Sequence, residues 1–300
     1  MVALPAGPWP TVLAFLCERF AQIEPAHWQA RMARGEVRDE AGHPLPPEAV
    51  YLPASKLWYW REPPAEVPIP FEAEILFQDE CLVVADKPHF LPTMPSGRYA
   101  RETLLARLQH QLGLDSLVPI HRLDRETAGI VAFCVQPRHR NAYQGLFRAR
   151  RAHKVYQAIA PWREGLAFPQ ERSSRLVTSA GHFMQMTEVE GEPSAHTRIE
   201  LTARHPSLPL ARYRLLPSTG QTHQLRVHML ALGLPLLGDR IYPVLLPEPA
   251  VGEVPNFEAP LQLLASELSF TDPVSGVQRH FYSKRSLKFP GGCSSMPLFL

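Results

Sequence analysis

The segment HRLDRETAGIVAF, residues 121–133, places an aspartate in a polar turn directly before an apolar run. A carboxylate fixed at the start of a buried strand can act as a nucleophile or as a general base. Gly129 would permit a close backbone approach at this turn, and residues 130–133 would anchor the turn in the core. An isolated aspartate in a turn usually only shapes that turn. Asp124 is therefore a candidate catalytic residue that needs support from other segments.

A second segment, STGQTHQLRVH at residues 218–228, gathers polar side chains at helical spacing. We predict a helix from residue 222 to residue 232 that Gly233 closes. Arg226 lies between two apolar residues, which indicates that its guanidinium is partly buried. A buried guanidinium needs a carboxylate partner, and Asp124 is the candidate. The alternative is an amphipathic helix with a solvated arginine.

A third segment, residues 137–156, is strongly basic. It holds six Lys or Arg and two His, and it contains no acidic residue. We predict a helix at residues 137–150 followed by a strand at residues 154–160. Most charged runs are solvated faces. The interleaved aromatic residues and the absence of acidic neighbours instead favour a surface that binds nucleic-acid phosphates.

Several other chemistries lack their sequence patterns. The chain has no G-x-S-x-G, no P-loop, no G-x-G-x-x-G and no H-E-x-x-H. Its 13 histidines are dispersed, and its four cysteines form no C-x-x-C pair. These observations argue against a nucleotide cofactor, a metal site and a disulfide framework. No basic leader or apolar run of about 18 residues is present, so we predict a cytoplasmic protein that does not bind membranes.

The composition is that of a globular protein. Of the 300 residues, 45% are hydrophobic and 20% are charged, and the formal net charge is only +2. A packed core is expected, while the net charge by itself says nothing about an RNA partner. The proline-dense segment 61–74 reads as a linker. We therefore predict one domain at residues 1–70 and a second at residues 71–300.

The elements that must position these residues can be read from apolar periodicity. The first part is predicted to contain two helices and two short strands, at residues 10–22, 25–33, 36–38 and 51–59. Beyond the basic segment and the helix at 222–232, the second part is predicted to contain one helix and six strands, at residues 102–112, 75–77, 82–85, 130–135, 197–202, 211–216 and 263–270. Because strands and helices do not alternate regularly, we predict an α+β fold with a mixed, mainly antiparallel sheet flanked by helices.

Together these segments resemble the RluA-type RNA pseudouridine synthases, over about residues 72–285. The motifs that carry the resemblance are His121–Asp124 with Thr127–Gly129, similar to H-R-L-D-x-x-T-S-G; Lys154–Ala158, similar to K-x-Y-x-A; Thr219–His228, similar to T-G-R-T-H-Q-L-R-V-H; Gly238–Tyr242, similar to G-D-x-x-Y; and Ile75–Pro88, similar to opening strands that end in N-K-P. Any one of them is a weak signal, but their occurrence in the family's order is specific.

The resemblance implies an isomerase that converts uridine in structured RNA to pseudouridine without a cofactor or metal. It implies catalytic roles for Asp124, for Arg226 as its ion-pair partner, and for Tyr156, whose ring would stack on the uracil and whose hydroxyl could assist proton removal. The expected substrate and RNA contacts are His121, Arg122, Lys154, Gln221, Thr222, His223, Gln224, Val227, Arg138, Arg148 and Arg151. Arg122 could fill the space that an extruded uridine leaves, or bind a phosphate.

The N-terminal part, residues 1–70, is similar to an S4-like RNA-binding module. Two short helices lead to residues 32–37, where a helix end turns into a strand, and Ala41-Gly42 would form the next turn. This module slightly favours ribosomal over transfer RNA as the substrate, and a monomer is expected. The part has six Lys or Arg against eight Asp or Glu. A packing domain without RNA contact is the alternative.

The chain departs from the family pattern in four places. Gln221 stands where an arginine is usual, Ala128 replaces Ser, Asp86 replaces Asn, and Leu264-Ala265 replaces His-Ala. None of these changes affects Asp124, Tyr156 or Arg226, so they bear on the substrate more than on the activity.

Two other functions remain alternatives. One is an RNA-binding or ribosome-assembly protein without catalysis. The other is a hydrolase that pairs Asp124 with His121 or His223, which only the residue types support.

Overall fold

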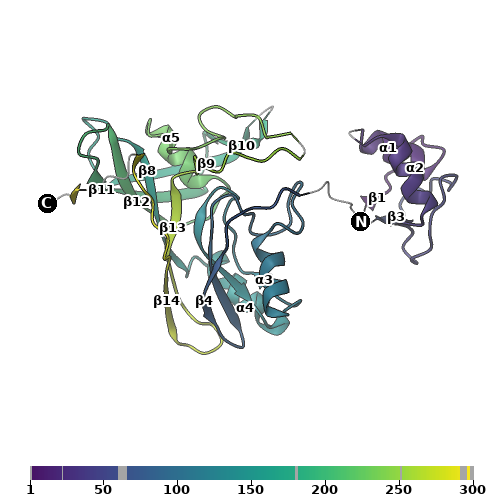
Figure 1. Cartoon of the computed structure of the whole chain (residues 1–300), viewed down its shortest axis with the longest axis horizontal. Helices are drawn as coiled ribbons and strands as arrows, with labels where there is room; N and C mark the ends of the chain where they lie inside the picture. The colour runs from purple at the N-terminus through teal and green to yellow at the C-terminus, as the bar shows by residue number, and fades with distance from the viewer. Residues whose placement is uncertain are drawn as a thin grey trace. The chain divides into compact units, whose positions relative to one another are not determined.

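The computed structural model describes residues 2–21, 23–59, 66–179, 182–250, 252–290 and 296–297. The chain divides into two units, Met1–Pro63 and Pro64–Leu300 (Figure 1). The division falls within the proline-dense segment predicted as a linker, part of which lies outside the described residues. No helix in the described part is long and apolar enough to cross a membrane.

The first unit combines two helices with a small antiparallel sheet. Helix α1 is Val12–Arg19, helix α2 is Pro25–Ala33, and the sheet order is β1-β3-β2, formed by Val2–Ala3, Lys56–Tyr59 and Val37–Arg38. Thr11 caps α1 by accepting from the N–H of Ala14 at 3.1 Å, and Gly35 follows α2 with a φ of +73°. Trp28 and Leu16 are fully buried. Both helices are confirmed, but the second strand is shorter than predicted.

The second unit is built on one mixed sheet. Its described strands follow the order β10-β9-β11-β12-β8-β13-β7-β5-β4, with β14 on β13, β6 on β7 and β15 on β11. The strands are β4 Glu74–Gln78, β5 Leu82–Lys87, β6 Val118–Pro119, β7 Ala128–Cys134, β8 His153–Pro161, β9 Gln170–Ser179, β10 His182–Val189, β11 Ala195–Arg204, β12 Leu210–Pro217, β13 Leu263–Thr271, β14 Gln278–Tyr282 and β15 Met296–Pro297. Among these described pairs, only β13 and β7 run parallel. The predicted α+β class with a mainly antiparallel sheet is confirmed.

Three α-helices flank this sheet in the described part. They are α3 Leu104–Leu112, α4 Arg140–Arg148, which follows a 3-10 turn at Pro137–His139, and α5 Gln224–Ala231. In Figure 1, α3 and α4 lie near β4, and α5 lies near β9 and β10. Helix α5 starts two residues later than predicted because His223 has a φ of +53° and cannot continue a right-handed helix.

The hairpin of β9 and β10 was not predicted from the sequence. Strand β9 alternates partly buried and exposed side chains, and Leu176 is its only buried residue. Without an apolar alternation, a largely exposed strand gives little signal. This hairpin nevertheless contributes Met186, which packs with Val227 and Tyr242 beside α5.

Gly129 fixes how β7 meets β13. In the parallel pair, Gly129 lies opposite Ala265 and has a φ of +114°. A Cβ at this glycine would lie 2.7 Å from the backbone nitrogen of Ala265, closer than any real contact. Tyr156 on β8 pairs with Ala265 from the other side. The glycine therefore brings the turn of Asp124 close to the strand that carries Tyr156.

Candidate active site

Asp124 lies in the turn between β6 and β7, and this turn is held from several directions. The N–H of Thr127 donates to the Asp124 carbonyl at 3.1 Å. Thr93 donates to the carbonyl of Leu123 at 2.9 Å and accepts from its N–H at 3.1 Å. The Asp124 side chain itself is 26% exposed. The backbone is thus fixed while the carboxylate can be reached from outside.

The side chain of Lys87 also holds this turn in place. Lys87 was not predicted from the sequence as a functional residue. Its fully buried ammonium donates to the carbonyls of Pro88, Leu91 and Arg125 at 3.0, 2.7 and 3.0 Å. Burial lowers the pKa of Lys87 to about 7, while the nearby carboxylates of Glu126 and Asp124 oppose that shift. The only sequence signal for it was its place in the Lys-Pro that ends the opening strands.

Arg226 is buried, as predicted, but its main partner differs from the prediction. Its Nε and Nη2 donate to Asp239 at 2.8 and 2.5 Å, in a bidentate pair whose side chains are each 1% exposed. Its Nη1 lies 3.7 Å from Asp124. The expected ion pair with Asp124 is present, whereas the paired hydrogen bonds expected there are made to Asp239. One buried guanidinium therefore serves two carboxylates.

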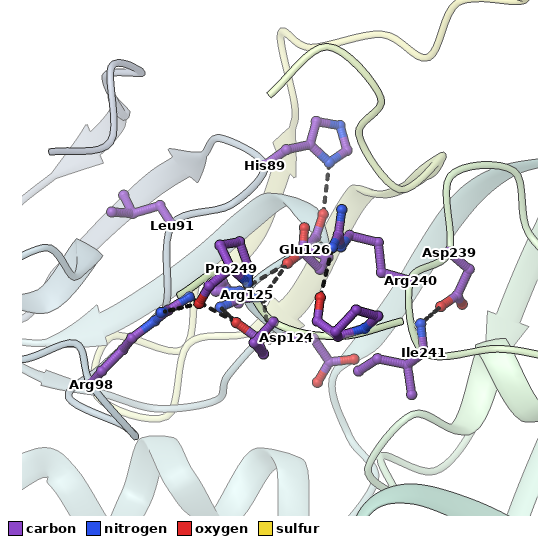
Figure 2. Close-up of polar contacts among 12 residues, drawn as sticks. His89, Leu91, Arg98, Asp124, Arg125, Glu126, Asp239, Arg240, Ile241 and Pro249 are labelled. Carbon is purple, nitrogen blue, oxygen red and sulfur yellow. Dashed lines mark hydrogen bonds and ion pairs between the residues drawn. The ribbon is translucent and has the colours of Figure 1, made fainter. Parts of the chain in front are cut away.

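Asp239 is positioned by its own loop. Its carboxylate also accepts from the N–H of Ile241 at 2.8 Å (Figure 2). It accepts from the N–H of Tyr242 at 3.0 Å as well. The preceding Gly238 has a φ of +75°, and a Cβ there would lie 2.9 Å from the carbonyl carbon of Pro260. The Gly-Asp-x-x-Tyr motif thus supplies the turn, the partner of Arg226 and the Tyr242 ring, which lies 5.3 Å from the guanidinium.

His223 completes the surroundings of Asp124. Its Nε2 lies 3.9 Å from the carboxylate, and its Nδ1 is hydrogen bonded to the Tyr242 hydroxyl at 3.0 Å. Burial lowers the pKa of His223 despite the opposing charge of Asp124. The imidazole is thus neutral at neutral pH, and the positive charge next to Asp124 comes from Arg226.

A pocket opens at Asp124, and Tyr156, Leu225 and Leu263 form its apolar lining. Burial raises the pKa of the Tyr156 phenol further above its normal value, and the Asp124 charge adds to the shift. The phenol therefore stays protonated at neutral pH and cannot act as a phenolate base. Its ring is available for stacking.

Lys154 and Thr127 contribute polar groups to the same pocket. Lys154 donates to the Thr219 carbonyl at 2.6 Å, and burial lowers its pKa to about 8. Thr127 also lines the pocket, and its buried hydroxyl has no hydrogen-bond partner among the described residues. A buried hydroxyl without a partner is a natural contact for a ligand. We did not identify Thr127 from the sequence, although it lies in the motif of Asp124.

Three residues predicted as RNA contacts have side chains that are engaged within the protein. The Nε2 of His121 accepts from the Ala132 N–H at 3.1 Å, and burial lowers its pKa to about 3. Gln224 is buried with its amide occupied by Thr219, Gln221, His196 and Thr197. Val227 is 4% exposed and packs with Tyr242. These side chains support the structure of the site, because their polar or apolar groups are already used within the protein.

The remaining predicted contacts are at or near the surface. Arg122 and Gln221 are exposed at the pocket edge, whereas Thr222 is exposed but does not line the pocket. Arg138, Arg148 and Arg151 are also exposed. The end of α4 approaches the Asp124 turn through Phe147, whose ring stacks on His121 with centroids 4.6 Å apart. The stacking of Phe147 on His121 thus connects the basic segment to the turn that carries Asp124.

The structure explains one departure from the family motif. Asp86 is 1% exposed and accepts from the hydroxyl of Ser283 at 2.8 Å and from the N–H of Lys284 at 2.8 Å. The guanidinium of Arg285 lies 3.4 Å away. An aspartate in place of asparagine therefore binds the segment after β14. Among the described residues, no group of three or more His, Cys, Asp or Glu is placed to hold a metal ion.

Comparisons with known proteins agree with this geometry. The family model described as RNA pseudouridylate synthase matches residues 81–231. The dual-specificity RNA pseudouridine synthase RluA of Vibrio vulnificus is 34% identical over 70% of this chain and 82% of its own length. An uncharacterized RNA pseudouridine synthase of Synechocystis sp. is 30% identical over 77% of this chain and 79% of its own.

Solved structures show the same fold. The human RNA pseudouridylate synthase domain containing 4 aligns with a TM-score of 0.52 at 28% identity, over 70% of this chain and 87% of that one. The human RNA pseudouridylate synthase domain containing 1 aligns with a TM-score of 0.59 at 20% identity, over 76% of this chain and 91% of that one.

Proposed function

Since the chain belongs to the RNA pseudouridylate synthase family, and is therefore an isomerase that acts on RNA, we propose that Asp124 is the nucleophile of its reaction. The observation that carries this proposal is the position of the Asp124 carboxylate. It lies in a pocket that the Tyr156 ring lines, 3.7 Å from a buried guanidinium whose other side is held by Asp239.

The reaction breaks the bond between N1 of uracil and C1′ of ribose and forms a bond between C5 and C1′. The C5 proton is lost and N1 gains a proton, so the product is an isomer. Arg226 stabilises the negative charge on Asp124, and the Tyr156 ring stacks on the uracil while it rotates. Because the phenol stays protonated, Tyr156 is not the base. Asp124 bonds to C1′ as the bond to N1 breaks, and it is released again when C5 bonds to C1′. Its freed carboxylate, the only one among the residues that line this pocket, then accepts the C5 proton.

Four surface residues bind the rest of the RNA. The target uridine must leave its stack, at a cost of a few kcal/mol. Arg122, exposed beside Asp124, occupies the vacated space or binds a phosphate. Arg138, Arg148 and Arg151 bind the backbone through charge. His121, Gln224 and Val227 have no part in this contact.

The substrate is ribosomal RNA in the first place and transfer RNA in the second. The S4-like resemblance of residues 1–70 supports ribosomal RNA. The dual specificity in the name of the Vibrio vulnificus relative is a reason to test both classes. Residues 1–70 form an S4-like RNA-binding module, and residues 71–300 form the catalytic domain. The protein acts as a monomer in the cytoplasm, in keeping with its scattered cysteines.

Pseudouridine mapping by carbodiimide chemistry tests the proposal. Total RNA is compared from cells that lack the protein and from cells complemented with wild type or Asp124→Asn. We expect a uridine that is modified only with the wild-type copy, which would also identify the substrate. If the Asp124→Asn copy restores the modification, Asp124 is not the nucleophile.

A further inference from the structure

A second pocket adjoins the one that Tyr156 lines. Its cavity volume is about 470 Å³, against about 100 Å³ for the first. The two pockets have five lining residues in common, which are Arg122, Leu123, Asp124, His223 and Arg226. With the target uridine placed in the first pocket, against Tyr156, the larger cavity is left for another group.

The far wall of this pocket is held by one carboxylate. Glu248 accepts from Arg98 at 2.9 Å and from Arg125 at 2.8 and 3.1 Å. Arg98 also donates to the Pro249 carbonyl at 2.9 Å (Figure 2). Three segments far apart in the sequence are thereby tied together: the loop after β5, the Asp124 turn and the loop after α5. A pocket whose wall is already ordered costs little to occupy.

The chemistry of the lining suits a nucleobase better than a phosphate. The charges of Arg98 and Arg125 are balanced by Glu248 and by Glu126, which Arg125 contacts at 2.8 Å. An already neutralised arginine attracts a phosphate weakly. Five further lining residues are apolar or aromatic: Met94, Leu123, Tyr99, Met184 and Ile241. Thr93 and Ser96 add polar groups, and the charged Arg122, Asp124 and Arg226 stand on the side shared with the first pocket. Unstacked RNA bases bind to such surfaces by stacking, with a few hydrogen bonds at their edges.

The guanidiniums of Arg98 and Arg125 each lie 5.6 Å from the centroid of the Tyr99 ring. One aromatic ring and two guanidinium groups thus lie next to one another in the pocket wall. Arg and aromatic planes are the usual supports for splayed bases. Because the target uridine leaves its stack, a neighbouring base loses a stacking partner and needs a new surface.

We propose that this second pocket, defined by Met94, Arg98, Tyr99, Arg125 and Glu248, binds an unpaired nucleobase of the substrate RNA close to the target uridine. The proposal rests on the proposed function, because it takes the target uridine to lie at Asp124. It makes the pocket a specificity site, since the base that fits would select which uridines are modified.

The test uses a stem-loop oligoribonucleotide that carries the uridine found by mapping, and versions in which one nucleotide within three positions on either side is abasic. Affinity is measured by fluorescence anisotropy and turnover by single-turnover assays. The full chain is compared with Met94→Trp, which fills the pocket from a residue that is 36% exposed. Ser96→Trp, also exposed in the lining, replaces it if the first variant does not fold.

The matched control is Val274→Trp. Val274 is 42% exposed in the turn between β13 and β14 and does not line either pocket. This variant adds the same indole elsewhere on the same unit, and its affinities should follow wild type.

For wild type, one abasic position should weaken binding by roughly 5- to 100-fold, the range for the loss of one stacked base. In the filled variant, the intact RNA should bind weakly and that abasic change should have no further effect. Equal losses at every abasic position in wild type and Met94→Trp would overturn the proposal. Binding without pseudouridine formation would overturn the proposed function instead. The affinities for the intact and abasic RNAs would still show whether the second pocket binds a base.

Discussion

The two arginine–carboxylate groups that flank Asp124 differ mainly in burial. Arg226 and Asp239 are each 1% exposed and form a bidentate pair. Arg125 and Glu248 are 27% and 43% exposed. The same chemical pairing therefore serves two purposes. The buried pair cannot be broken without leaving a charge in the core, whereas water can replace either partner of the exposed pair.

Removing the buried carboxylate should have the largest effect. We expect Asp239→Ala to lower the free energy of unfolding by about 3–5 kcal/mol, because it leaves the Arg226 guanidinium buried without its main partner. Turnover should fall as well, since Arg226 would no longer be held beside Asp124. Chemical denaturation and single-turnover rates measure the two effects. The control is Asp115→Ala, an exposed aspartate after α3, which should change stability by less than about 0.5 kcal/mol. Equal stability losses would contradict the comparison.

A buried histidine two residues after Arg226 on α5 should make stability depend on pH. Burial lowers the pKa of His228 from 6.5 to about 4. Between these values the unfolded chain binds a proton that the folded protein does not, so stability falls as the pH falls through this window, by about 1.4 kcal/mol per pH unit. His228→Gln should flatten that part of the profile, measured by denaturation at pH 4 to 7. The control is His110→Gln, at an exposed position on α3. If His110→Gln flattened the pH profile of stability to a similar extent, the burial of His228 would not explain the effect.

Substitution of an exposed arginine should affect RNA binding and leave stability unchanged. We expect Arg151→Gln to reduce the slope of log affinity against log salt concentration by about 1, with unchanged stability, because one phosphate contact is lost. Titrations of the mapped stem-loop at several salt concentrations measure the slope. Lys288→Gln, exposed in the segment after β14, is the control. An unaltered slope for Arg151→Gln would exclude this arginine from the RNA surface.

Neutralising the exposed carboxylate should have the smallest effect on folding. Because Glu248 is 43% exposed, Glu248→Gln should change the free energy of unfolding by no more than about 1 kcal/mol. Asp239→Asn is the matched change at the buried pair. If Glu248→Gln destabilised the protein as much as Asp239→Asn, burial would not be what separates the two pairs.

Several features could be read from the sequence because short-range physical chemistry decides them. The turn of Asp124 follows from a polar stretch that runs into an apolar strand. The ends of α2 and α5 follow from Gly35 and Gly233, which tolerate a positive φ. The mixed sheet follows from strand patterns without a regular helix between them. Where these signals were weak, as in the exposed hairpin of β9 and β10, no strand was predicted.

Which groups meet, in contrast, was decided by the tertiary structure. A sequence shows that Arg226 needs a carboxylate but cannot choose between Asp124 and Asp239, because the choice depends on distances set by packing. The same holds for His121, Gln224 and Val227, whose residue types suit RNA contacts but whose side chains are used inside the protein. Lys87 became significant only when the fold brought the carbonyls of Pro88, Leu91 and Arg125 around one ammonium. Residue types are local properties, whereas burial and partner choice arise from segments that are distant along the chain.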